Sequence, residues 1–327
     1  MDMTGWRGWL SIAILGTCVH AEEPALRLKI EAKVGTADFR SGPVHAIQGT
    51  PIWFRVSGAG DEGTLRWFQI VPDTARYYKN ANHPWEAEPY EWVGFGKIEY
   101  QCIEIEAWRG REEVELGSAD VFHRASPSPY YNEELGSFWL QVEALSGMKR
   151  LRSAGLQEND VYNLSPEVFR LSIQKDRSYL GYLTGFFNVP GLFGSIPYQS
   201  HHYIGVDCAD VLVAANQRWR GLEEGKDSNV SMLVSAWKAV VSFPIVGGMP
   251  KATIKWSDQV QPGDAIAVRY TPGKAFQHIG ALYEDTNHNG VLDAPDEVIH
   301  AGPHALHLSR LREGGFDGEA VILRPPR

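Results

Sequence analysis

The chain has 327 residues, of which 43% are hydrophobic and 22% are charged, so it can bury a sizeable core and is not a disordered polymer. Its formal net charge is -9, and no block of basic residues stands out. Nucleic acids and anionic membranes bind surfaces rich in Lys and Arg, and we therefore exclude nucleic acid as a partner.

The N-terminal segment has the pattern of a signal peptide. Arg7 precedes an apolar run over residues 9–19, and Ala21 follows at a suitable cleavage position. The run is shorter than the roughly 20 residues that span a bilayer. We predict a signal peptide over residues 1–21 and a mature protein that is secreted or held in the periplasm or cell envelope, without stable membrane insertion. An anchor that stays uncut is the alternative.

Alternating apolar and polar residues predict strands in the segment that follows. The positions of Trp67, Tyr100 and Cys102 resemble core positions of an immunoglobulin-like β-sandwich, with Phe54 where that fold has its first disulfide cysteine. We therefore predict such a domain over residues 22–120, with Cys102 facing its core and a bulge just after it. The predicted strands cover residues 26–30, 52–56, 65–70 and 98–102.

Residues 121–180 are predicted to form a linker and a helical segment. Ser and Pro residues over 126–131 are typical of a linker. Apolar residues recur with helical spacing over 133–152, and Ser165 followed by Pro166 is a typical helix start.

Residues 181–327 are predicted to fold as an α+β domain. One helix is expected to begin near Cys208, and a second is expected over residues 229–243. Of the chain's three cysteines, Cys18 leaves with the signal peptide, and two are too few for a disulfide-dependent exported domain, so Cys102 and Cys208 are predicted to be free thiols. The strands of this domain are predicted over residues 265–268, 278–283, 297–300 and 320–323.

Cys208 is the strongest candidate for a catalytic residue. A thiol at a helix start is favoured as the thiolate by the unpaired N–H groups there, and Asp207 is a candidate N-cap. His278 and His300 lie on two later predicted strands that are expected to be adjacent. One of these imidazoles can act as the base and hold the thiolate as an ion pair, and the other can fix its tautomer.

The segments around these residues resemble the NlpC family of cell-wall cysteine endopeptidases over about residues 195–327. The resemblance implies a papain-like catalytic domain over residues 181–327, preceded here by the immunoglobulin-like sandwich. It is carried by Pro197-Tyr198, Asp207-Cys208-Ala209-Asp210, Pro262-Gly263-Asp264, His278-Ile279-Gly280-Ala281-Leu282-Tyr283, Ile299-His300-Ala301 and Leu308-Ser309-Arg310-Leu311.

The resemblance also implies an activity and a set of site residues. Cys208 would be the nucleophile, His278 the base and His300 the orienting residue, while Tyr198 would lie near the oxyanion together with the Cys208 backbone N–H. The reaction would be hydrolysis of amide bonds in peptidoglycan stem peptides, and no cofactor would be required for catalysis.

One departure from the family pattern keeps alternatives open. Ala209 and Asp210 stand where the family has Ser-Gly, and a carboxylate this close can raise the pKa of the thiol. The first alternative is acyl transfer or deamidation by the same site. The second is a cell-wall binding protein that has lost activity.

Other histidines are interpreted as outside the catalytic set. His201 and His202 are expected to line the cleft or to face solvent. A metal site formed by His300, His304 and His307 is disfavoured, because no acidic or cysteine partner has the usual ligand spacing.

Residues 285–296 resemble a calcium-binding loop, with oxygen ligands at alternate positions and a glycine for the sharp turn. Such an ion would be structural and would stiffen the connection between the two histidine strands. The alternative is a polar hairpin, because Asn289-Gly290 is a strong turn signal by itself. The predicted ligands are Asp285, Asn287, Asn289, Val291, Asp293 and Asp296.

Overall fold

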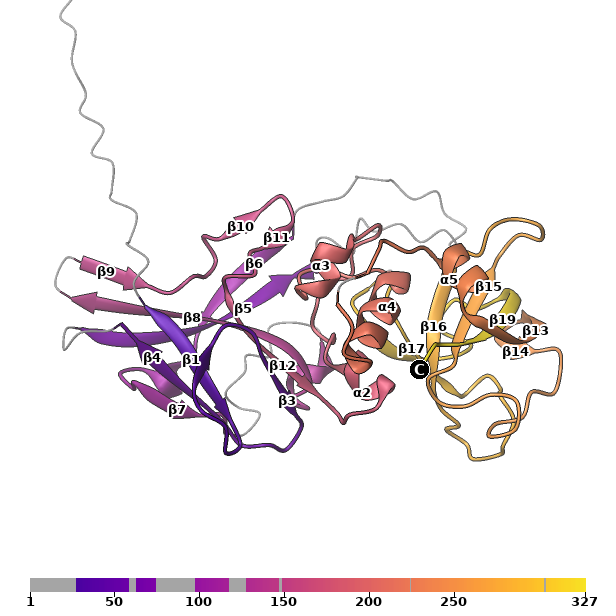
Figure 1. Ribbon diagram of the computed structural model, residues 1–327, viewed down its shortest axis with the longest axis horizontal. Coiled ribbons are helices and arrows are strands. Elements are labelled where there is room, and N and C mark those ends of the chain that lie inside the picture. The colour runs from indigo at the N-terminus through magenta and orange to yellow at the C-terminus, as the bar shows by residue number, and fades with distance from the viewer. Residues whose placement is uncertain are drawn as a thin grey trace, which may run out of the picture.

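The computed structural model describes residues 28–58, 63–74, 98–117, 128–146, 149–223, 225–302 and 304–327. The predicted signal peptide lies outside the described residues, as does the first part of the predicted linker. The fold is mostly β, with 40% strand and 14% helix arranged as several sheets and a half-barrel. Figure 1 shows helices α2, α3 and α4 between the N-terminal sheets and the C-terminal sheet.

The N-terminal half contains two main sheets. A four-stranded antiparallel sheet has the order β2-β1-β4-β7. A larger sheet has the order β3-β12-β8-β5-β6, with β9 paired to β8 and with β3 parallel to β12. The bounds are β1 (Lys29–Val34), β2 (Arg40–Ser41), β3 (Val44–Ile47), β4 (Ile52–Ser57), β5 (Thr64–Asp73), β6 (Glu99–Glu104), β7 (Glu113–Glu115), β8 (Gly136–Ser146), β9 (Lys149–Arg152) and β12 (Phe169–Gln174). A separate hairpin is formed by β10 (Asn159–Asp160) and β11 (Asn163–Leu164), and two 3-10 turns are η1 (Glu106–Trp108) and η2 (Pro129–Tyr131).

Aromatic side chains fill the core of this half. Trp67 is fully buried, and its ring centroid lies 6.5 Å from that of Phe54 and 5.5 Å from that of Trp108. The prediction that Trp67 and Phe54 are core residues is therefore confirmed. The prediction for Cys102 is wrong, because that residue is exposed. The predicted bulge is wrong as well, since β5 and β6 pair in unbroken register.

The helices predicted between residues 133 and 174 are strands. Strand β8 lies between β5 and β12, and its side chains are buried on both faces of the sheet from Gly136 to Ala144. A strand buried on both faces lacks the simple two-residue alternation, and its apolar residues then imitate helical spacing. Ser165 caps a turn, with its hydroxyl accepting from the Glu167 N–H at 3.2 Å, and the chain then enters β12.

The C-terminal half consists of four helices and one seven-stranded antiparallel sheet. The sheet order is β14-β13-β19-β15-β16-β17-β18. The helices are α2 (Tyr179–Thr184), α3 (Pro197–His201), α4 (Cys208–Trp219) and α5 (Val230–Ala236). The strands are β13 (Lys238–Val246), β14 (Met249–Pro250), β15 (Ala265–Arg269), β16 (His278–Glu284), β17 (Glu297–His300), β18 (His307–Arg310) and β19 (Gly318–Arg324).

Most predicted elements of this half are confirmed. The helix at Cys208 and the four predicted strands are present as α4, β15, β16, β17 and β19. The predicted helix over residues 229–243 is correct only in its first half. It ends at Ala236, because the β-branched residues that follow pair with β19 as strand β13.

The C-terminal sheet has two buried faces. One face packs against α4 and carries Ile279, Ala281, Ile299 and Ala301. The opposite face packs against Phe316. The residues on that opposite face include Ile266, Val268, Leu282, Val298 and Ile322.

One core joins the two halves. The cluster of buried residues that covers the α4 face of the C-terminal sheet extends without a break to Trp67 in the N-terminal half. Tyr130 links them directly, because its ring stacks on Phe187 at 3.6 Å and its hydroxyl accepts from the Leu308 N–H at 2.8 Å. The N-terminal sheets therefore support the helices that carry Cys208.

The predicted fold class is wrong. We expected an α+β, papain-like domain behind an immunoglobulin-like sandwich, and the chain is instead mostly β with several sheets and a half-barrel. The reason lies largely in residues 133–152, which were expected to be helical, and in the helix start expected at Ser165, because these segments lead into β8 and β12 of the larger N-terminal sheet. No helix in the described part of the chain is long and apolar enough to cross a membrane.

Candidate functional site

The site is organised by the N-terminus of α4, which begins at Cys208 as predicted. Asp207 is the N-cap, and its carboxylate accepts from the N–H groups of Ala209 at 2.9 Å and Asp210 at 2.8 Å. The Ser195 hydroxyl accepts from the Asp207 N–H at 2.8 Å and donates to the Asp210 carboxylate at 2.6 Å. The first turn of α4 is thereby fixed from both sides.

The end of α4 is also set by local sequence. Gly221 has a positive φ of 67°, its N–H donates to the Arg218 carbonyl, and the Leu222 N–H donates to the Gln217 carbonyl. This is the pattern of a Schellman motif, in which a glycine adopts the left-handed conformation just after a helix.

The Cys208 side chain lies against the start of β16. The Ile279 backbone N–H is hydrogen-bonded to the sulfur, and the residue as a whole keeps partial solvent exposure. His278, the neighbour of Ile279, is the first residue of β16. The structure therefore brings the predicted nucleophile to the residue adjacent to the predicted base. Cys208 and Cys102 are both free thiols, as predicted.

The thiol is neutral in this environment. Burial of the sulfur raises the pKa of Cys208 strongly, and the carboxylates of Asp207 and then Asp210 raise it further, against the lowering effect of the Ile279 N–H. The expected preformed thiolate–imidazolium pair is therefore not the ground state of the site. The effect of Asp210 has the direction predicted from its departure from the family pattern.

The two acidic residues are themselves perturbed. Burial raises the pKa of Asp207 to about 6 and the pKa of Asp210 to about 7, and the charge of Asp207 adds to the shift of Asp210. Their backbone and hydroxyl donors act in the opposite direction. Near neutral pH the first turn of α4 therefore carries a titrating pair of carboxyl groups beside the thiol.

His278 and His300 form a hydrogen-bonded pair. Nε2 of His278 lies 3.0 Å from Nδ1 of His300, and Nε2 of His300 lies 2.8 Å from the Ser309 hydroxyl. Burial lowers the pKa of His278 to about 3 and lowers the pKa of His300 well below its usual range. Both imidazoles are therefore neutral at pH 7, which is the protonation state of a general base.

The two imidazoles extend from the sheet face opposite to α4. The His278 ring packs on Phe316 at 4.9 Å, whereas Ile279, one residue later, packs with α4 on the other face. The thiol contacts the backbone at the start of β16, and His278 is the first residue of that strand. Because Nε2 of His278 is engaged by His300, a proton from Cys208 would pass to Nδ1.

Gly280 is a site residue whose role the sequence reasoning missed. A Cβ atom there would lie 2.8 Å from both His300 Cβ and Val298 Cγ1 and 3.0 Å from the Ile299 carbonyl oxygen. The glycine therefore lets β17 bring His300 close to β16. The available signal was a glycine inside a strand, which often marks close approach of a neighbouring chain.

Tyr270 and Ser309 were also missed as neighbours of the site. Tyr270 follows β15, its hydroxyl donates to the Gly315 carbonyl at 2.9 Å, and burial raises its pKa, as does negative charge at Cys208. No local pattern distinguishes Tyr270 in the sequence, and Ser309 was noted only as part of the segment 308–311 that resembles the family, because its place beside His300 depends on strand pairing.

Tyr198 lies on α3, and its ring contacts the rings of Tyr162 at 5.6 Å and His202 at 4.7 Å. The N–H of Ile279 contacts the sulfur. The oxyanion role of Tyr198 stays a prediction. His201 and His202 are both half-buried.

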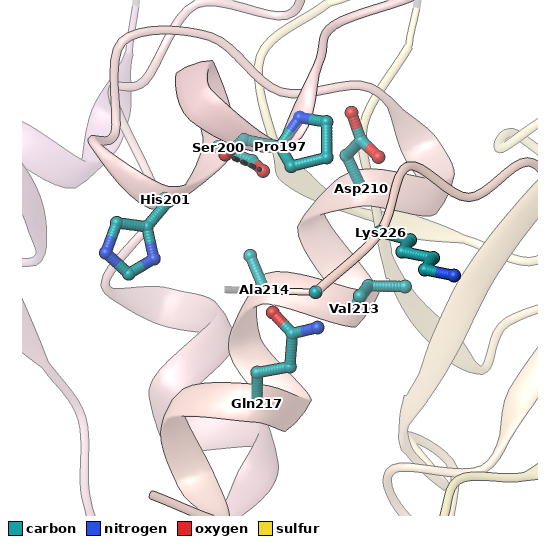
Figure 2. Close-up of a pocket in the computed structure, with 9 residues that line it drawn as sticks. Pro197, Ser200, His201, Asp210, Val213, Ala214, Gln217 and Lys226 are labelled. Carbon is teal, nitrogen blue, oxygen red and sulfur yellow. Dashed lines mark hydrogen bonds between the residues drawn. The ribbon is translucent and has the colours of Figure 1, made fainter. Parts of the chain in front are cut away.

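A small cavity lies between α3 and α4 (Figure 2). Cys208 is not among the residues that line it. Its volume is about 10 Å³, which is the space of about one water molecule. This cavity is too small for a peptide substrate. It lies beside the Asp210 side chain, which forms part of its lining. Its lining includes Pro197, Ser200, His201, Asp210, Val213 and Gln217.

The predicted calcium loop folds around its own side chains. The Asp285 carboxylate accepts from the N–H groups of Asn289 at 3.3 Å and Gly290 at 2.8 Å, and the side-chain amides of Asn287 and Asn289 donate to Asp293. These four predicted ligands are brought together, while Val291 donates its N–H to Asn289. The calcium prediction stays a prediction.

Asp296, the predicted last ligand, is engaged in hydrogen bonds in this structure. It is fully buried, and its carboxylate accepts from the Trp256 indole at 2.9 Å and from the N–H groups of Asp293 at 3.0 Å and Thr286 at 3.2 Å. It anchors the loop to Trp256. Within the described ranges, no cluster of three or more His, Cys, Asp or Glu side chains is placed to hold a metal ion, and this includes His300, His304 and His307.

Comparison with known proteins adds no identification. No family model, no curated protein and no solved structure matches this chain. The resemblance of its motifs to the NlpC family therefore enters the functional argument only as a proposal.

Proposed function

We propose that this chain is an exported cysteine hydrolase that cleaves amide bonds in peptidoglycan stem peptides. The observation that carries the proposal is the hydrogen bond between the Ile279 N–H and the Cys208 sulfur, one residue along β16 from His278. Nε2 of His278 in turn lies 3.0 Å from Nδ1 of His300. The motifs shared with the NlpC family supply the substrate class. No residue pattern in the chain requires a cofactor for this chemistry.

The proposed reaction starts from two neutral groups. Nδ1 of His278 takes the thiol proton as the Cys208 sulfur attacks the carbonyl carbon of the scissile amide. The Cys208 N–H, at the free end of α4, donates to the oxyanion, and Tyr198 is the predicted second donor. The protonated His278 then gives its proton to the leaving amine, and a thioester remains on the sulfur.

Hydrolysis completes the cycle. His278 removes a proton from water, the resulting hydroxide attacks the thioester carbonyl, and the sulfur leaves with the proton returned by the imidazole. An amine in place of water would give acyl transfer, and release of ammonia in the first step would be deamidation. The three outcomes use the same residues and differ in the leaving group and the acceptor.

Loss of activity is the second candidate, and the raised pKa of the thiol favours it. Asp207 and Asp210 oppose ionisation of Cys208, so a site used only for binding would show this environment as well. The rate of alkylation by iodoacetamide at neutral pH separates the two. A thiol assisted by His278 reacts faster than free cysteine, and an unassisted buried thiol reacts more slowly.

Incubation of the purified protein with muropeptides, followed by mass spectrometry, tests the proposal. We expect shortened stem peptides from the wild type and none from Cys208→Ala. Cys102→Ala is the matched control, because it removes the other free thiol, and it should cleave like the wild type. Cleavage that persists in Cys208→Ala would falsify the mechanism.

A further inference from the structure

The His278–His300 pair continues into a third group, the hydroxyl of Ser309. His300 pairs across the sheet with His307, and Ser309 lies two residues further along β18, on the same side. The Ser309 hydroxyl is 2.8 Å from Nε2 of His300. Phe316 and His307 enclose the His300 ring, at centroid distances of 5.3 Å and 4.4 Å. The result is a line of three hydrogen-bonding groups that begins at the buried His278.

The direction of these hydrogen bonds decides whether His278 can be a base. If Nδ1 of His278 is to accept the thiol proton, the ring must carry its proton on Nε2, which then donates to Nδ1 of His300. His300 must in turn carry its proton on Nε2 and donate it to Ser309. With the reverse direction, Ser309 donates, every proton in the line moves to the other nitrogen, and Nδ1 of His278 is already protonated.

We propose that Ser309 is a positioning residue that accepts the His300 proton and thereby holds His278 in the tautomer with Nδ1 free of a proton. This inference rests on the proposed function, and it adds to that function a residue with a defined role. Ser309 touches neither the thiol nor the substrate in this scheme. It acts through His300, as a third residue orients the base in other nucleophile–base pairs.

A neutral hydroxyl suits this position. The titratable groups that face His300 are His278, His307 and, at greater distance, His304, and all of them lower the pKa of His300. A carboxylate at position 309 would accept the same proton, but it would also stabilise an imidazolium and make His300 cationic. The serine hydroxyl can accept the His300 proton without adding charge, so the line stays neutral.

Three variants and two readouts test this inference. Nitrogen-15 NMR of the histidine rings reports which nitrogen carries the proton and needs no turnover. In the wild type we expect Nε2–H on both His278 and His300, and the same in Ser309→Thr. In Ser309→Ala we expect a mixture of tautomers at His278. In Ser309→Asp we expect an imidazolium signal from His300 near neutral pH.

The kinetic readout is kcat on muropeptides. Ser309→Ala should lower kcat at least about tenfold with little change in KM, since an orienting group acts on the chemical step, and Ser309→Thr should restore most of it. Nδ1–H on His278 in the wild type would overturn the inference, and so would an Ala variant with unchanged tautomers and unchanged kcat. If the wild type cleaves no muropeptide, the proposed function fails, while the NMR result still decides the role of Ser309.

Discussion

The pKa of the Cys208 thiol is subject to opposing effects. The N-terminus of α4 and the Ile279 N–H favour the thiolate, but burial and two carboxylates favour the thiol, and the thiol prevails. The buried imidazole of His278 is also uncharged, because its pKa is lowered to about 3. The resting site therefore begins without charge separation, and both pKa shifts oppose proton transfer from the thiol to the imidazole.

Replacing Asp210 by Asn should make the thiol more reactive. The amide keeps an oxygen for the Ser195 hydroxyl but removes the charge that raises the pKa of Cys208. We expect alkylation of Cys208 by iodoacetamide at pH 8 to accelerate by about threefold to tenfold, since each unit of pKa is a tenfold change in the thiolate fraction.

The effect should depend on pH in a defined direction. Asp210 has a pKa raised to about 7, so its carboxyl group is charged at pH 8 and mostly neutral at pH 5.5. The difference between Asp210→Asn and the wild type should therefore shrink as the pH falls below 7. Asp258→Asn, at an exposed turn position, is the control and should match the wild type throughout. Equal rates for Asp210→Asn and the wild type at pH 8 would show that Asp210 does not act on the thiol.

Strands β16 and β17 form the element that builds the catalytic pair. Their antiparallel pairing places Gly280 opposite His300, and this close approach sets the 3.0 Å contact between the two imidazoles. The loop that joins the strands, anchored by Asp296 to Trp256, holds the same register from the other end. The geometry of the site is thus a property of this strand pair as well as of α4.

Replacing Gly280 by Ala should separate the two strands. The new methyl group would lie 2.8 Å from atoms of His300 and Val298, and overpacking of this kind costs about 1–3 kcal/mol. We expect a lower melting temperature and at least about a tenfold loss of kcat, because His300 can no longer orient His278. Gly117→Ala is the matched control, since a Cβ there meets nothing within 4 Å. Wild-type kcat in Gly280→Ala would contradict the role given to this strand pair.

The elements of the C-terminal half could largely be predicted from the sequence, because their signals are local. Asp207 before an apolar run marks the start of α4, and the strands around His278 and His300 are short apolar runs between turns. Strand β8 could not be predicted in the same way. It is buried on both faces by residues far away in the chain, and its polar residues Gln141 and Glu143 are buried too.

The protonation states of the site residues could not be predicted from the sequence either. The low pKa of His278 results from burial beneath Phe316, and the hydrogen bond between His300 and Ser309 results from the pairing of β17 with β18. A thiol at a helix start predicts a thiolate when only local contacts are considered. Tertiary burial reversed that expectation while preserving the set of residues.

At the scale of the whole molecule, the two halves share one continuous core, and the helices that carry the site lie between their sheets (Figure 1). The contact of Tyr130 with Phe187 and with the β18 backbone ties the N-terminal half to the strand that supplies Ser309. The N-terminal sheets therefore belong to the framework that positions Cys208 and the histidine pair, in addition to any binding role of their own.

Intact-protein mass spectrometry, with the protein quenched in acid during its reaction with muropeptides, tests the central claim most directly. The account predicts a mass increase equal to the acyl part of the cleaved peptide, located on the fragment that contains Cys208 and absent from Cys208→Ala. Product formation by Cys208→Ala with no adduct on the wild type would contradict it, and so would a wild type that forms neither adduct nor product.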